Sequence, residues 1–533
     1  MNGLPTWPIA PLVAAAIPVT LALGGALLPR RATALLRAAF LLASLFAVVV
    51  FGAYDLGRPA SDFGVRVDAL TALMLVLVTS LGAIVARFSE NYLGGDTGRR
   101  SERWHHYQRW LLFTLSAVTT LVVSNNLLVM AASWTATSLA LHQLLTLYED
   151  REAAQVAAHK KFLVSRLADL ALAPALLLVY SNVGSFELDV IAAWLSAESN
   201  LPLSMQVAAA LLVSAVALRS AQLPFHGWIT QVMEAPTPVS ALLHAGVVNI
   251  GGFVLIRLAP WISRAEPAQL LLVAIGLTST IAAALVMMTR VSVKVALAWS
   301  TCAQMGFLLV QCGLGLWPLA FLHIVAHSLY KAHAFLSAGG AVEAWETRVL
   351  TKRPATIGRQ ILEGALSLLF AGAALLGATL LQSYWGAKPA HWPTAIVLTL
   401  LVGLSLPPLM SAPRSPRIWS GVALRMLVVV ALYFGWHAAA ERLVPTPTLQ
   451  SSSAGLWLVG LGFVGLFITK STIALRPNGA FARALHPWLF SGLYLDDFLT
   501  RLMFRVWPPH LPRPKQVATR ALSTPAALEV QSS

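Results

Sequence analysis

Three titratable residues recur at every fourth position within one apolar segment. His323, His327 and Lys331 lie in the run FLHIVAHSLYKAHAFLS, and this spacing places them in one stripe along one face of a helix. Histidine gains and loses protons near neutral pH, and lysine does so when desolvation or a neighbouring cation lowers its pKa. The stripe therefore predicts a relay for protons, or for sodium ions.

A second group of candidates lies in residues 217–253, ALRSAQLPFHGWITQVMEAPTPVSALLHAGVVNIGGF. Three prolines interrupt what would otherwise be a pair of helices, because proline cannot donate the backbone hydrogen bond of a helix. A broken helix at membrane depth is tolerated only where it lines a cavity or is buried in protein. The ionisable candidates in this segment are Arg219, His226, Glu234 and His244.

Further candidates lie in three other apolar segments. Arg166 and Asp169 lie three residues apart on one helix face, in KKFLVSRLADLALAP. Lys294 stands near the start of VSVKVALAWSTCAQMGF, and His142 lies in SWTATSLALHQLL. Each also has a purely structural interpretation, as an ion pair, a snorkelling charge or a histidine bound to a carbonyl. The HxxxH pair of the stripe has the spacing of metal ligands, although no carboxylate or thiolate is near it in the sequence.

The composition indicates that membrane-spanning helices carry these residues. Of the 533 residues, 57% are hydrophobic and 11% charged, against roughly 25% charged in an average soluble protein. Long apolar runs recur, and only helices or closed barrels satisfy the backbone in lipid. Because the runs do not alternate, we predict an all-α polytopic membrane protein with about fifteen transmembrane helices. The predicted spans are about 8–28, 33–54, 68–87, 109–124, 127–148, 160–180, 203–220 (continuing to 233), 238–258, 268–289, 296–313, 317–340, 362–384, 392–411, 418–438 and 454–475.

Lysine and arginine residues gather in every second loop, which explains the net charge of +15 without nucleic acid. This pattern predicts a bacterial inner-membrane protein with a periplasmic N-terminus and a cytoplasmic C-terminus. Arg257 and Arg264 are exceptions, because their loop would be periplasmic. Residues 8–28 are interpreted as a retained helix, 185–198 as an interfacial helix and 508–533 as a mobile tail or partner-binding arm. Cys302 and Cys312 are predicted to be small core residues.

The motif SAQLPFHGWITQVMEAPTPVSALLHAGVV resembles the signature of the antiporter-like subunits of respiratory complex I and the Mrp antiporters. The segments KKFLVSRLAD, VKVALAWSTCAQMGF and FLHIVAHSLYKAHAFLSAGG match the same family in order. The resemblance implies two inverted five-helix repeats, each with a discontinuous helix, at 109–260 and 268–412. N-terminal helices would then occupy 1–108, C-terminal helices 413–475 and a cytoplasmic tail 476–533.

The same resemblance implies a chain of buried charges near the bilayer midplane. The positions that match its central relay residues are His244, Lys294, His323, His327 and Lys331, and Asp169 matches an acidic position of the family.

Two departures from the family pattern affect the first half of the chain. Pumping members of complex I carry a glutamate where this chain has Thr135, and a lysine where it has Arg219. Arginine does not deprotonate in proteins, so Arg219 holds a charge without carrying a proton. His142, seven residues after Thr135 on the same face, is the candidate substitute acceptor. The lysine expected within 362–384 and a long lateral helix near the C-terminus are not evident either.

With these departures the chain is similar to the membrane subunits of DAB inorganic-carbon accumulation systems. That resemblance implies a partner, a DabA-like zinc subunit related to β-carbonic anhydrases. Cation flow through the membrane subunit would drive the one-way hydration of CO2 to bicarbonate, and the chain itself would be neither an enzyme nor the holder of a cofactor. The alternatives are a subunit of complex I or an Mrp antiporter, and a non-conducting anchor for a soluble enzyme. The retained stripe of titratable residues argues against the anchor.

Overall fold

The computed structural model describes residues 9–53, 60–93, 102–340 and 453–509, together with the single positions 435, 439, 443 and 444. The spans predicted at 362–384 and 392–411 lie outside these residues, as does the span at 418–438 except for position 435. The predicted second repeat is therefore described only as far as residue 340.

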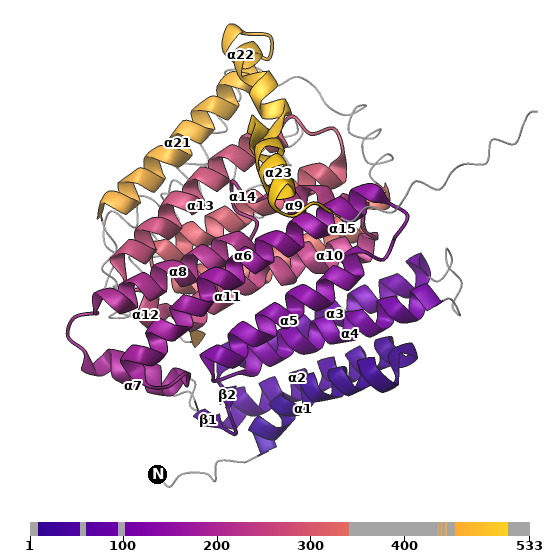
Figure 1. The fold of residues 1–533 in the computed structure, drawn as a ribbon, viewed down its shortest axis with the longest axis vertical. Helices are drawn as coiled ribbons and strands as arrows, with labels where there is room; N and C mark the ends of the chain where they lie inside the picture. The colour runs from indigo at the N-terminus through magenta and orange to yellow at the C-terminus, as the bar shows by residue number, and fades with distance from the viewer. Residues whose placement is uncertain are drawn as a thin grey trace, which may run out of the picture.

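The described residues form an all-α polytopic membrane fold, as predicted (Figure 1). In this part of the chain, 9 helical segments are long and apolar enough to cross a membrane. The remaining predicted spans all fall on described helices. The long helices are α1 (Ile9–Leu27), α2 (Ala32–Ala53), α3 (Ala69–Tyr92), α4 (Glu102–Val123), α5 (Leu127–Leu145), α6 (Glu152–Val183), α8 (Leu203–Arg219), α13 (Glu266–Met287), α14 (Val293–Gly313), α15 (Trp317–Leu336) and α21 (Ser453–Leu475).

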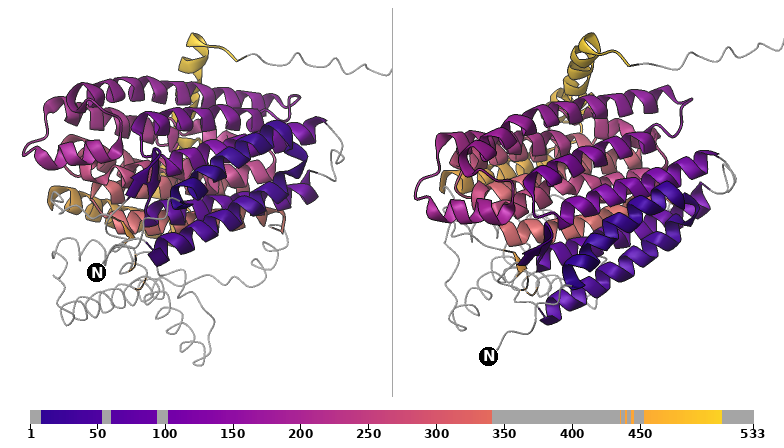
Figure 2. Two further views of the ribbon diagram at one scale, coloured as in Figure 1. Left: turned by 90° about the horizontal axis from the view of Figure 1, so that it is seen from below. Right: turned by 60° about the horizontal axis from the view of Figure 1, so that its bottom comes forward.

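These helices lie side by side in one bundle, with α1 and α2 at one edge and α21 at the opposite edge (Figures 1 and 2). Between the edges, α4, α5, α6, α8 and α13 each pack on the next, and α13 packs closely on α14. The close approach depends on two bare glycines, because a Cβ atom on Gly276 would lie 2.5 Å from the carbonyl oxygen of Gly306.

The broken region follows α8, and the structure confirms the predicted interruption. After Arg219 the chain forms α9 (Gly227–Gln231) and a 3-10 turn η2 (Val232–Glu234), and then α10 (Thr237–Ala245). Another 3-10 turn, η3 (Val247–Asn249), separates α10 from α11 (Ile250–Arg257). About nine-tenths of the segment 237–257 is buried inside the protein. Neighbouring helices, and not lipid, therefore surround its interrupted backbone.

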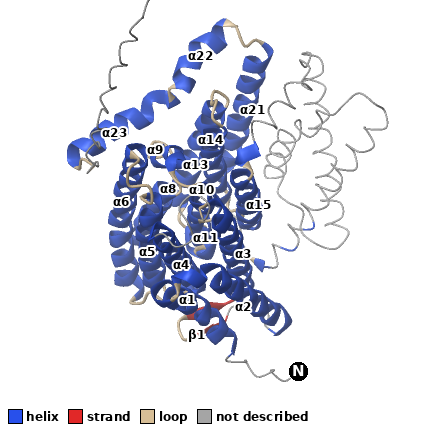
Figure 3. Cartoon of the chain, turned by 90° about the vertical axis from the view of Figure 1, so that its right-hand side faces the viewer, coloured by secondary structure: helices blue, strands red, loops and turns tan. Residues whose placement is uncertain are grey.

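Three further features lie at the ends of the bundle. A hairpin of β1 (Ala60–Asp62) and β2 (Val65–Val67), with Ala60 opposite Val67, precedes α3. The short helix predicted at 185–198 is α7 (Leu188–Ala197). The predicted tail contains two helices, α22 (Ala480–Phe490) and α23 (Leu495–Val506), which lie across one end of the bundle beyond α6, α9 and α14 (Figure 3).

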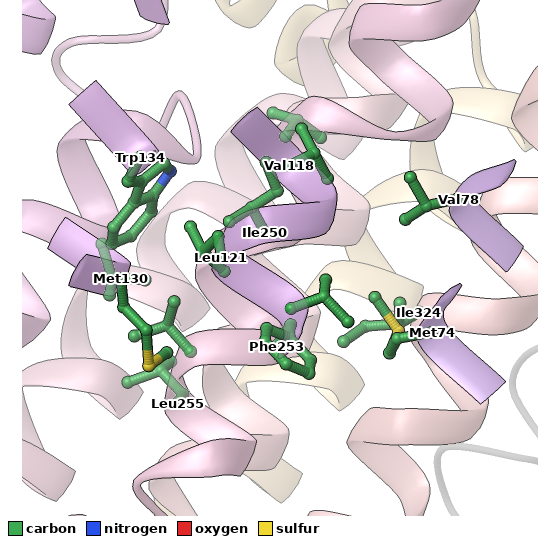
Figure 4. Close-up of a cluster of buried hydrophobic side chains, with 14 of the residues drawn as sticks. Met74, Val78, Val118, Leu121, Met130, Trp134, Ile250, Phe253, Leu255 and Ile324 are labelled. Carbon is green, nitrogen blue, oxygen red and sulfur yellow. The ribbon is translucent and has the colours of Figure 1, made fainter. Parts of the chain in front are cut away.

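The hydrophobic core surrounds α11. Figure 4 shows its side chains among those of α3, α4, α5 and α15. Cys302 and Cys312 are buried free thiols, as predicted. The labelled core residues are Met74, Val78, Val118, Leu121, Met130, Trp134, Ile250, Phe253, Leu255 and Ile324.

Candidate functional site

An ionic cluster joins α5, α6 and α8 inside the bundle. Asp169 pairs with Arg166 at 2.9 Å and with Arg219, and it accepts a hydrogen bond of 2.8 Å from the Thr135 hydroxyl. Arg219 also donates to Thr135 at 3.1 Å. The predicted pair of Arg166 and Asp169 is thus present. Thr135 and Arg219, the two departures, meet at the same carboxylate.

Arg219 is the most buried member of this cluster, with its side chain 5% exposed. Its guanidinium lies 4.6 Å from the Trp134 ring centroid, so a cation–π contact supplements the ion pair. A buried guanidinium is stable only with a paired countercharge, and Asp169 supplies it. The cluster therefore fixes one positive charge between α6 and α8.

Lys161 is a buried residue of α6 that was not among the candidates from the sequence. Its Nζ donates to the carbonyl oxygen of Ser138 at 2.5 Å and to the Ser138 hydroxyl at 2.8 Å. The helix α6 begins at Glu152, about two turns before the predicted start near residue 160. Lys161 therefore lies well inside the helix and not at its end. The sequence did contain a signal for this position. Lys161, Ser165 and Asp169 are spaced four residues apart, which places Lys161 on the same helix face as Asp169.

His142 lies on α5 one turn beyond Ser138. It is partly buried, and its ring centroid is 5.7 Å from that of Phe162 on α6. Among the described residues its Nδ1 has no hydrogen-bond partner. Because Thr135 bonds Asp169 and Arg219 directly, His142 is not part of the ionic cluster, and its role as an acceptor stays a prediction.

The second line of residues lies between α10, α14 and α15. Lys331 is fully buried, and its Nζ donates to the Leu297 carbonyl at 3.0 Å and to the Ser300 hydroxyl at 2.8 Å. The His244 Nδ1 lies 3.1 Å from the Thr301 hydroxyl, and its ring stacks on Phe335 with the centroids 4.3 Å apart.

The two stripe histidines continue this line along α15. His323 and His327 lie with ring centroids 5.8 Å apart, and His327 is close enough to His244 and Lys331 to interact with both electrostatically. His323 Nδ1 is 2.9 Å from the amide oxygen of Gln311 on α14. Neither ring nitrogen of His327 has a hydrogen-bond partner within the described ranges, although His327 is buried. The predicted stripe faces protein and not lipid.

Lys294 lies at the end of this line. Its Nζ donates to the Thr237 hydroxyl at 2.9 Å, which connects the first turn of α14 to the first turn of α10. Gln311 lies in the last turn of α14. With a rise of 1.5 Å per residue, the line from Lys294 to Gln311 runs for about 26 Å, most of the hydrocarbon thickness of a bilayer.

Two candidates from the broken region lie outside both buried lines. Glu234 is half exposed and lies 3.7 Å from Arg151, so it joins neither buried line. His226 is buried, with Nδ1 3.1 Å from the Pro224 carbonyl and its ring 4.6 Å from Trp299. The carbonyl contact that a structural histidine would make is present.

The C-terminal helix α23 is bonded to the broken region. Asp496 pairs with Lys160 of α6 at 3.1 Å and accepts a hydrogen bond of 2.6 Å from the Gln231 amide. Lys160 is 2% exposed, so Asp496 is the countercharge of a buried ammonium. A Cβ atom on Gly227 would overlap the Asp496 carboxylate, so this position of α9 requires glycine.

A second ionic network lies at the start of α3 and includes Arg257, one of the two exceptional arginines. Asp68 caps α3 by accepting from the Thr71 N–H at 2.8 Å, and it pairs with Arg66 at 2.9 Å and with Arg257. Burial alone raises the pKa of Asp68, but the two arginines and the Thr71 N–H outweigh burial and hold this pKa well below its usual range. Arg264 donates to the Glu198 carbonyl at 2.6 Å. Both arginines thus have partners within the protein.

Within the described residues, no group of three or more His, Cys, Asp or Glu side chains is placed to hold a metal ion. The HxxxH pair uses one nitrogen of His323 on Gln311. Both ring nitrogens of His327 and the Nε2 atom of His323 have no hydrogen-bond partner among the described residues.

The fold and the buried lines of ionisable residues define a polytopic membrane protein of the antiporter-like class. A family model described as "NADH:quinone oxidoreductase/Mrp antiporter, TM" matches residues 124–353, and "NADH-Ubiquinone oxidoreductase (complex I), chain 5 N-terminus" matches 55–101. A solved chain of the Mrp complex from Dietzia sp. DQ12-45-1b is similar in fold, with a TM-score of 0.62 and 23% identity. The match covers 93% of this chain and 59% of that one.

Two relatives place the chain more narrowly. It is 37% identical to "Probable inorganic carbon transporter subunit DabB" of Hydrogenovibrio crunogenus, over 94% of this chain and 96% of that protein. It is 35% identical to "Probable inorganic carbon transporter subunit DabB2" of Halothiobacillus neapolitanus, over 90% of this chain and 87% of that protein. The chain belongs to the DabB family of membrane proteins, and the resemblance seen in its motifs is confirmed.

Proposed function

We propose that the chain is the cation-conducting membrane subunit of an inorganic-carbon accumulation complex, and that it conducts protons. The observation that carries the proposal is the line of Lys331, His327 and His323 against α14, in which Lys331 and His327 are buried and His323 is partly buried. A membrane protein that served only as an anchor would gain nothing from these titratable groups, since each is costly inside the bilayer.

The order of the residues along α14 and α15 suggests the route. A proton would enter at His323, pass to His327 and then to Lys331 beside His244, and leave near Lys294. Each of the two histidines has a ring nitrogen without a hydrogen-bond partner among the described residues, and buried polar groups need such partners. Water bound at these nitrogens would complete a proton path.

The proposed direction of proton flow follows from the predicted topology, in which the N-terminus is periplasmic and the loop around Arg290 and Lys294 is cytoplasmic. Arg257 and Arg264, the exceptions to that topology, are bound to Asp68 and to the Glu198 carbonyl. Protons would thus run from periplasm to cytoplasm, and one elementary charge crossing 100 mV releases about 2.3 kcal/mol. A few protons per turnover would bias CO2 hydration towards bicarbonate on a partner.

The partner of this proposal is a DabA-like zinc subunit that performs the hydration. The helices α22 and α23 are its proposed contact, because they present the exposed aromatic residues Trp488 and Phe498 and the exposed Arg501. Asp496 on the same helix contacts Lys160 and Gln231. A partner bound there would lie next to the broken region.

The experiment is the uptake of labelled inorganic carbon by cells that depend on this system. Lys331→Ala should abolish accumulation while the variant chain still reaches the membrane in normal amounts. His333→Ala is the matched control, because His333 lies on the same helix with an exposed side chain. Normal accumulation with Lys331→Ala would remove Lys331 from the mechanism.

A further inference from the structure

The buried Lys161 is held in the same way as Lys331. In α6 the Lys161 ammonium binds the carbonyl and the hydroxyl of Ser138 on α5. In α15 the Lys331 ammonium binds the Leu297 carbonyl and the Ser300 hydroxyl on α14. In the part of the chain that the structure describes, neither lysine pairs with a carboxylate. Each could release a proton without leaving an unpaired carboxylate behind.

The two lysines also occupy matching places in the chain. α5 and α6 are the second and third helices of the predicted first repeat, and α14 and α15 are the second and third helices of the predicted second repeat. A lysine of the third helix therefore binds a serine of the second helix in both halves. A chance surface lysine would not reproduce both the helix order and the bonding partners.

The residues around Lys161 form a polar ladder between α5 and α6. Thr135 bonds Asp169, then Ser138 bonds Lys161, and His142 follows one turn later on α5. The ladder ends near a polar cleft of about 910 Å³ that is lined by Gln143, Thr146, Arg103 and Glu149, among others.

Few of the groups that face Lys161 can exchange a proton. Arg166 and Arg219 act on it as charges but remain protonated, and Asp169 is bound by both arginines. Thr135 does not titrate in the working range of a protein. His142 and, further out, His159 are the other titratable side chains on this side. Lys161 and His142 are thus the proton-exchanging pair of the ladder.

We propose that Lys161 is the proton-exchanging residue of the first half of the protein, with His142 between it and the cleft at the end of α5. The proposal rests on the proposed function as a proton conductor. Lys161 then takes the role that Arg219 cannot perform, and Asp169 with its arginines sets the local field. The first half conducts through a residue of α6.

The test compares two adjacent lysines. Lys160 is as buried as Lys161, but it pairs with Asp496. Arginine at either position keeps the positive charge and cannot release the proton. The full-length chain is reconstituted in liposomes, and proton flux is measured with an internal pH dye under an imposed potential. Lys161→Arg should lower flux by about tenfold or more, and Lys160→Arg should stay within about twofold of the unaltered chain.

A rescue variant separates proton exchange from packing. Lys161→His should retain flux with its pH profile shifted to lower pH, because histidine titrates near pH 6.5 and lysine higher. A purely structural lysine would give no such shift. If Lys161→Arg fails to assemble, Lys161→His and Ser138→Ala carry the test, and a pH profile unchanged in both would overturn the proposal.

Lys331→Met, measured in parallel, distinguishes two kinds of failure. Flux lost in Lys331→Met but unchanged in Lys161→Arg overturns this inference and leaves the proposed function standing. An unaltered chain without proton flux overturns the proposed function and this inference together.

Discussion

The network around Asp68 allows a quantitative prediction about stability. Its carboxylate is 13% exposed and is the countercharge of Arg257, which is 4% exposed. Removing one partner of a buried ion pair costs about 3–5 kcal/mol, because the other charge stays buried and unpaired. Arg257 keeps a hydrogen bond of 2.7 Å to the Thr71 hydroxyl, so we expect the lower end of that range.

Two substitutions of Asp68 separate its charge from its cap. Asparagine caps helices about as well as aspartate, so Asp68→Asn removes the charge alone and should cost about 3 kcal/mol. Asp68→Ala also removes the bond to the Thr71 N–H and should cost about 1 kcal/mol more. Asp189→Asn is the control, because Asp189 pairs with Arg66 at 2.9 Å but is 42% exposed. It should cost under about 1 kcal/mol.

The pH dependence has a definite sign. The pKa of Asp68 is lower in the folded protein than its ordinary value of 3.8, so its contribution to stability is complete above that value. This contribution is lost as the pH falls towards the lower pKa that Asp68 has in the folded protein. The unaltered protein should therefore lose stability below about pH 4, and Asp68→Asn should lose less over the same interval.

The assay is denaturant unfolding of the full-length protein in detergent, followed by circular dichroism. A free energy of unfolding for Asp68→Asn within about 0.5 kcal/mol of the unaltered protein would refute the reasoning. An equal loss for Asp189→Asn would refute it as well, because exposed and buried carboxylates would then contribute alike.

Two further predictions concern the C-terminal helices and the partner. Gly227→Ala should displace Asp496 from Lys160 and lower the thermal midpoint of unfolding in detergent. The control Gly52→Ala has open space around its Cβ position, so it should leave this midpoint unchanged or raise it. Equal midpoints for the two variants would contradict the contact between Gly227 and Asp496. Purification of the tagged chain from its native membranes should bring along a protein with stoichiometric zinc by elemental analysis, and Phe498→Asp on α23 should reduce its recovery, while a zinc-free preparation would contradict the proposed partner.

The sequence predicted the membrane class, most helix positions and the stripe on α15, because apolar length and a spacing of four residues are local signals. It missed Lys161, because its partner Ser138 lies on another helix, 23 residues earlier in the sequence. The pairing of Arg257 with Asp68 was also missed, because the two residues lie 189 positions apart in the sequence.

The first-half cluster was predicted in its members but not in its arrangement. Arg166 and Asp169 could be paired from their spacing on one helix. The meeting of Thr135 and Arg219 at Asp169 joins three helices, and spacing within one helix contains no information about such contacts. The contact of Asp496 with Lys160 is likewise a tertiary contact over more than 300 residues.

The central claim is that protons pass between side chains buried along α14 and α15, and proton flux through the reconstituted chain tests it most directly. Liposomes in sodium-free buffer, with an imposed potential of about 100 mV, should show flux for the unaltered chain and a loss of about tenfold or more for Lys331→Met. A Lys331→Met protein that conducts protons at the unaltered rate would contradict the claim.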